Sequence, residues 1–130
     1  MGQRTAGFRC KLIVWEKAVQ LCTAIYDLTQ KFPREERYGL TNQLRRASVS
    51  IPGNIAEGYG RGARDQYKQF LSIALGSCME LQTQLTIAVR LGFLEPSDYE
   101  KVEMLASEVG KMLSAILNKL RSPSTLIPKP

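Results

Sequence analysis

The segment RDQYKQFLSIALGSCMELQTQLTIAVRL, residues 64–91, decides the fold of this chain. Apolar residues recur in it at every third or fourth position: Tyr67, Leu71, Ala74, Cys78, Leu81, Leu85 and Ala88. This spacing places them along one side of a helix, as in the seam of a helical bundle. The segment therefore predicts a long amphipathic helix in an all-α protein.

Three further segments have the same period. The first, residues 14–32, is expected to end before Pro33, because a residue that precedes proline is disfavoured in the helical conformation. The second, residues 35–57, contains Pro52, which lacks an N–H and crowds the carbonyl of Ser48. Because the apolar pattern continues across Pro52, we expect one helix that is kinked near this residue rather than two separate helices.

The ends of the remaining helices carry local signals. Gly92 is a plausible C-terminal residue for the helix over 64–91. Ser97 and Glu100 match a capping box, which predicts a helix that begins there and runs to about Arg121. A loop is expected after the second helix, where three glycines follow at alternate positions: Gly58, Gly60 and Gly62.

These four helices predict an antiparallel up-down-up-down four-helix bundle over residues 12–121. Residues 1–11 are expected to form an N-terminal extension, and the proline-rich residues 122–130 a mobile tail. No segment is apolar enough for a membrane span or a secretory signal, so we expect no membrane partner.

The composition argues against most catalytic chemistry. The 130 residues include no histidine, which removes the commonest general base and metal ligand. The three cysteines, Cys10, Cys22 and Cys78, have no metal-binding spacing, and we interpret them as reduced thiols of a cytoplasmic protein. We therefore expect no enzyme activity, no catalytic residue, no metal and no cofactor.

The charge of the chain is +6, with 18 basic and 12 acidic residues, and residues 1–68 carry the whole excess. Much of this excess clusters around the second helix and the glycine segment, at Arg34, Arg37, Arg45, Arg46, Arg61, Arg64 and Lys68. The residues predicted to bind nucleic acid are Arg45, Arg46, Arg61, Arg64 and Lys68. Arginine suits phosphate, because its planar fork donates two parallel hydrogen bonds. The alternative is a solvated face with internal ion pairs. The glycine segment itself is either an anion-binding loop or an ordinary turn, since it lacks the sequence of a phosphate-binding P-loop.

Two further groups of residues have alternative interpretations. Glu57 and Glu80, with Asn54, are expected to form a structural polar network near the bundle interior rather than an acid/base or metal pair. A second apolar stripe on the first helix is either bundle core or an oligomer interface: Trp15, Val19, Cys22 and Tyr26.

Many of these residues also fall into ordered motifs that cover about residues 8–121. The motifs are Leu12-x-Val14-Trp15-x-Lys17-Ala18, Phe32-Pro33-x-x-Glu36, Tyr38-Gly39-Leu40-Thr41-x-Gln43-Leu44-Arg45-Arg46-Ala47, Ser50-Ile51-Pro52-x-Asn54-Ile55-Ala56-Glu57-Gly58, Phe70-Leu71-x-Ile73-Ala74-x-Gly76-Ser77 and Glu80-Leu81-x-Thr83-Gln84-Leu85. This string resembles the 23S ribosomal RNA intervening-sequence proteins of bacteria, often called four helix bundle proteins.

The resemblance implies a four-helix bundle that assembles as a ring-like homopentamer. It also implies a relationship to the accessory variability determinant of diversity-generating retroelements, a basic pentamer that binds nucleic acid and a reverse transcriptase. It brings no catalytic residues.

Two hypotheses about function follow. The first is a non-enzymatic, oligomeric nucleic-acid-binding protein that contacts phosphates, of RNA in preference to DNA. The second is a protein-interaction scaffold, for example an accessory subunit that binds a reverse transcriptase.

Overall fold

The computed structural model describes residues 12–121. Its elements are α2 (Ile13–Thr29), the 3-10 helix η1 (Arg34–Glu36), α3 (Leu40–Arg61), α4 (Arg64–Arg90) and α5 (Pro96–Arg121). The prediction of an all-α chain with four long helices is confirmed, since residues 12–121 contain no strand. The predicted extension and tail lie outside the described residues. No helix in residues 12–121 is both long and apolar enough to cross a membrane.

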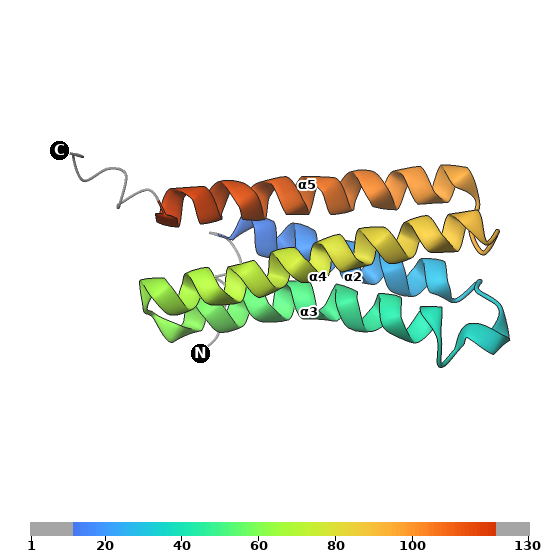
Figure 1. Ribbon diagram of the computed structural model, residues 1–130, viewed down its shortest axis with the longest axis horizontal. Helices are drawn as coiled ribbons and strands as arrows, with labels where there is room; N and C mark the ends of the chain where they lie inside the picture. Colours follow the sequence, from blue (N-terminus) through green and yellow to red (C-terminus); the bar gives the residue numbers. More distant parts are fainter. Residues whose placement is uncertain (1–11, 122–130) are drawn as a thin grey trace.

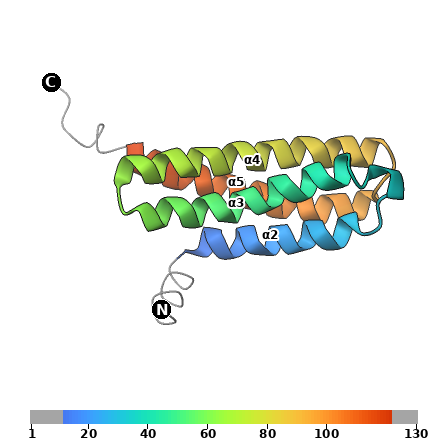
Figure 2. The same ribbon diagram turned by 90° about the horizontal axis from the view of Figure 1, so that it is seen from below.

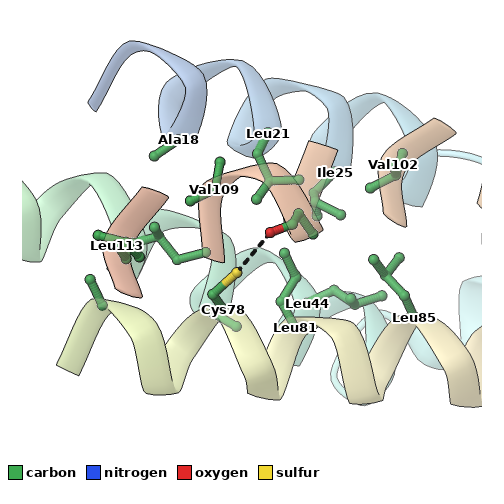
Figure 3. Close-up of a cluster of buried hydrophobic side chains, with 14 of the residues drawn as sticks. Ala18, Leu21, Ile25, Leu44, Cys78, Leu81, Leu85, Val102, Val109 and Leu113 are labelled. Carbon is green, nitrogen blue, oxygen red and sulfur yellow. Dashed lines mark hydrogen bonds between the residues drawn. The ribbon is translucent and has the colours of Figure 1, made fainter. Parts of the chain in front are cut away.

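The four helices lie side by side along one axis, and successive helices are joined at alternate ends of the molecule (Figures 1 and 2). Each helix packs against two others, because α2 and α4 both contact α3 and α5. All four helices contribute fully buried side chains to one core, among them Leu21, Leu44, Leu81 and Leu113 (Figure 3). The apolar side of each helix is thus removed from water, which is the main source of stability in such a fold.

The two central prolines act differently. Pro33 has an extended backbone (φ −56°, ψ 142°) between α2, which already ends at Thr29, and η1. Pro52 lies inside α3, and the helix continues on both sides of it. The expectation of one helix across Pro52 is therefore confirmed, and the kink at this residue stays a prediction.

The prediction of a loop at Gly58 and Gly60 is wrong. Both residues belong to α3, and only Gly62 and Ala63 connect α3 to α4. Gly62 ends the helix with a left-handed backbone (φ 72°). Gly58 is required for a different reason, because a Cβ at this position would lie 2.7 Å from the Cβ of Phe70 on α4. Its lack of a side chain allows α3 and α4 to approach closely.

Of the two signals predicted at the connection between α4 and α5, one is confirmed and one is wrong. Gly92 has φ 79°, and the Phe93 N–H donates to the Ala88 carbonyl at 2.9 Å, so the predicted C-terminal role of Gly92 is confirmed. The predicted cap at Ser97 is wrong, because α5 already begins at Pro96. Proline suits the first helical position, where its missing N–H would have no partner in any case.

Candidate nucleic-acid interface

The predicted nucleic-acid-binding residues do not form one patch. Arg45 and Arg46 lie in the second turn of α3, whereas Arg61 is its last residue. At 1.5 Å per residue, about 22 Å of helix separates the two groups. Arg64 and Lys68, in the first turns of α4, lie at the same end of the bundle as Arg61.

Arg45 and Arg46 have different surroundings. The Arg45 guanidinium lies over the ring of Tyr26, 4.6 Å from its centroid. It donates from Nε to the Thr29 hydroxyl at 2.8 Å and from a terminal nitrogen to the Tyr26 carbonyl at 3.3 Å. Arg46 is exposed beside Glu80, in a shallow hollow between α3 and α4. Arg45 therefore has a fixed orientation against α2, and Arg46 faces water.

At the opposite end, the cations have partners that are themselves solvated. Arg61 pairs with Glu57 at 2.9 Å, and the exposed fractions of the two side chains are 47% and 51%. Lys68 lies 4.0 Å from a carboxylate oxygen of Asp65. Exposed pairs of this kind contribute little stability, so a phosphate can replace the carboxylate at low cost.

Arg64 joins this end of the bundle to the end of α5. Its guanidinium donates two hydrogen bonds to the carbonyl oxygen of Leu120, at 2.7 and 3.0 Å. Lys119 and Arg121 flank Leu120 and are exposed. Five basic residues therefore meet here, and we call them the basic end: Arg61, Arg64, Lys68, Lys119 and Arg121 (left in Figure 1).

Lys119 and Arg121 were not among the predicted residues, because the positive and negative charges over residues 69–130 balance. The predicted topology of the bundle could nevertheless have indicated these two residues. In an up-down bundle, the end of the fourth helix lies beside the connection between the second and third helices.

The polar network between α3 and α4 includes Asn54, as predicted, but its other members are Ser50 and Ser77 and not the two glutamates. Asn54 donates from Nδ2 to the carbonyl and hydroxyl oxygens of Ser50, at 2.7 and 2.9 Å, and the Ser50 and Ser77 hydroxyls are 2.8 Å apart. Glu57 pairs with Arg61 instead. Glu80 was expected near the bundle interior, and this prediction is wrong. Although Leu81 beside it in sequence is buried, the helical turn directs Glu80 to the other side of α4, where it is exposed to water.

The second apolar stripe of α2 is half-covered. Trp15 packs against the core, and Cys22 accepts a hydrogen bond from the Ser48 hydroxyl at 3.5 Å. Val19 is half-buried, and Tyr26, beneath Arg45, is the most exposed member of the stripe. Its role as an oligomer interface stays a prediction.

Cys78 is a core thiol, as its apolar position predicted. It is fully buried in α4 and donates to the Ala106 carbonyl of α5 at 3.2 Å (dashed in Figure 3). Burial raises the pKa of this thiol to about 11, and the charge of Glu103 acts in the same direction. Within residues 12–121, no three cysteine or carboxylate side chains come together as a metal site.

Comparison with known proteins places the chain in a family. Its fold is similar to the 1.70 Å crystal structure of a protein with unknown function from the S23 ribosomal protein family of Bacteroides thetaiotaomicron. The TM-score is 0.76 at 22% identity, over 82% of this chain and 96% of that chain, a likeness that shows the fold alone. No curated protein matches the chain. The model of the 23S rRNA-intervening sequence proteins matches residues 10–115, which include α2, α3, α4 and most of α5. The chain therefore belongs to the 23S rRNA-intervening sequence protein family.

Proposed function

We propose that this protein is a non-enzymatic, cytoplasmic RNA-binding protein, an antiparallel four-helix bundle that contacts phosphates through its basic end. The contact of Arg64 with the Leu120 carbonyl is the observation that carries the proposal. This contact holds the start of α4 to the end of α5, and the five cations of the basic end, from α3, α4 and α5, lie at this end of the bundle with the carboxylates of Glu57 and Asp65.

The geometry favours contacts with the phosphate backbone of RNA over contacts with its bases. Two aromatic residues beside the basic end, Tyr59 and Tyr67, pack edge to face with ring centroids 6.2 Å apart. Each ring thus already has an aromatic neighbour, which limits stacking on bases. Affinity that arises from phosphate contacts falls steeply as salt increases, because binding releases counterions.

Self-association would strengthen this binding. We propose a homo-oligomer, a pentamer by analogy with the family, whose charge is a multiple of the +6 of one chain. Several basic ends on one particle would bind a polyanion by avidity even where each binds weakly.

The test compares two double variants that remove the same charge. Lys119→Gln/Arg121→Gln changes the basic end, and Arg90→Gln/Lys101→Gln changes exposed residues at the opposite end. Fluorescence anisotropy with a labelled single-stranded RNA, over a series of salt concentrations, gives the affinity and its salt slope. We expect the first variant to lower the slope by about one to two, and the second to leave it close to wild type. Absence of binding at low salt, or equal effects of both variants, contradicts the proposal.

A protein-interaction scaffold is the second candidate, and exposed methionines favour it. Met79 on α4 and Met104 on α5 are 61% and 73% exposed, and Met79 lines a shallow groove between these helices. Flexible methionine side chains suit the binding of protein partners, of which a reverse transcriptase is one candidate. Freshly purified protein without the ultraviolet absorbance of nucleic acid, together with partner binding that Met79→Ser/Met104→Ser abolishes, would favour the scaffold.

A further inference from the structure

A hollow at the end of the bundle opposite the basic end is lined by arginine and hydroxyl side chains. It lies where α2, η1 and the start of α3 meet, with a volume of about 270 Å³. Its polar lining residues are Thr29, Gln30, Arg34, Arg37, Thr41 and Arg45, and none of its lining residues is acidic.

The three arginines approach the hollow from different parts of the chain. Arg34 belongs to η1, Arg37 directly follows η1, and Arg45 extends from the second turn of α3. The bonds from Arg45 to Thr29 and to the Tyr26 carbonyl hold its guanidinium in place. A fixed guanidinium loses less conformational freedom on binding than a mobile one, so the hollow is partly preorganised.

Thr41 adds a hydroxyl group to the arginines of the hollow. Its side chain lines the hollow, only 8% of the residue is exposed, and its hydroxyl makes no hydrogen bond within residues 12–121. The hydroxyl oxygen itself is open to the hollow, since it is not among the buried polar atoms without a partner, and it can therefore bind a ligand there. Thr41 is also in the first turn of α3, where the Glu36 carboxylate already accepts from the Leu40 N–H at 3.0 Å, so the attraction for a further anion comes from the arginines.

We infer that this hollow binds a phosphate group, as inorganic phosphate or as the terminal phosphate of a larger molecule. Three cations without a lining carboxylate select an anion, and a phosphate offers enough oxygens to engage several guanidinium groups and a hydroxyl together. The hollow, at about 270 Å³, is large enough to admit a phosphate group, either free or as part of a larger molecule. Because the hollow lies at the other end of the bundle, this site is independent of RNA binding by the basic end.

Titration calorimetry with inorganic phosphate at low ionic strength tests the site without RNA. Arg37→Gln removes one lining charge, Thr41→Val replaces the hydroxyl with a methyl group of similar size, and Lys31→Gln removes an exposed charge that does not line the hollow. We expect the Kd for phosphate to rise about tenfold or more in Arg37→Gln and severalfold in Thr41→Val, and to change less than about twofold in Lys31→Gln. Circular dichroism checks that each variant is folded. Absence of phosphate binding by the wild type, or equal weakening by Arg37→Gln and Lys31→Gln, overturns the inference.

The source of the phosphate is tested with two RNA oligonucleotides that differ only in a 5′-phosphate or a 5′-hydroxyl group. Tighter binding of the phosphorylated RNA, lost in Arg37→Gln, supports the site and identifies a nucleic-acid end as its ligand. Equal affinity for both RNAs, with Arg37-dependent binding of inorganic phosphate, supports the site with free phosphate as its ligand. If the proposed RNA binding fails, the calorimetric result still stands, because it uses phosphate alone.

Discussion

The Arg64 guanidinium, at the first residue of α4, donates two hydrogen bonds to the Leu120 carbonyl, one residue before the end of α5. The last carbonyls of a helix have no N–H partner within it, so Arg64 satisfies one that would otherwise bind water. Its positive charge also lies at the negative end of the helix dipole.

We therefore expect Arg64→Gln to lower the free energy of unfolding by about 1 kcal/mol, the value for a charged hydrogen bond reduced for solvent exposure. Urea denaturation followed by circular dichroism measures it. Arg46→Gln is the matched control, because Arg46 is exposed on α3 and makes no such contact. If Arg46→Gln lowers the free energy of unfolding as much as Arg64→Gln does, the change in net charge, and not the lost contact with Leu120, is the cause of the destabilisation.

Gly58→Ala is expected to destabilise the bundle by about 1–2 kcal/mol, although alanine favours helix by nearly 1 kcal/mol over glycine. The new Cβ would lie 2.7 Å from the Phe70 Cβ and 3.2 Å from the Tyr67 Cδ1, so α3 and α4 must separate. In Gly53→Ala, the Cβ has no neighbour within 4 Å, and this control should be unchanged or slightly more stable. Thermal unfolding of the two variants should move in opposite directions, and a stabilised Gly58→Ala would disprove the close approach.

Cys78 should make the fold sensitive to alkaline pH. Its folded pKa of about 11 lies above the usual 9.0, so its contribution to stability is complete below pH 9 and is lost between pH 9 and 11. The free energy of unfolding should therefore fall more steeply over this range in the wild type than in Cys78→Ala. Tyr67, whose pKa burial also raises, is present in both proteins and does not affect the difference. Parallel pH profiles would show that the Cys78 thiol does not titrate differently in the folded state.

The α2 stripe provides a test of self-association. Light scattering should give the wild type a mass that is a multiple of 14.6 kDa, and Trp15→Ser/Tyr26→Ser should reduce it to that of a helical monomer. Tyr38→Ser is a control, because Tyr38 is 87% exposed and lies outside α2. Loss of helical circular dichroism in the double variant would assign these residues to the core, which Trp15 partly contacts. A wild-type mass of 14.6 kDa would exclude the oligomer.

Residue order alone was sufficient to predict the four helices, because each helical segment carries its own apolar period. Local signals at single residues were less informative. Gly92 ends a helix as predicted, but Gly58 lies within one, since a glycine suits both a turn and a close contact between helices. Ser97 matches a capping pattern, but the helix begins one residue earlier, at Pro96, because proline suits the first position of a helix.

The sequence by itself therefore determined the fold class, the content of the core and the excess of positive charge. Only the tertiary structure decided which charges lie together: Arg45 with Arg34 and Arg37 at one end, and Arg64 with Lys119 and Arg121 at the other. It also decided that Glu80 faces water. The physical reason is that neighbours from distant segments depend on the direction and rotation of each helix, and these are set only when the apolar sides of all four helices pack against one another.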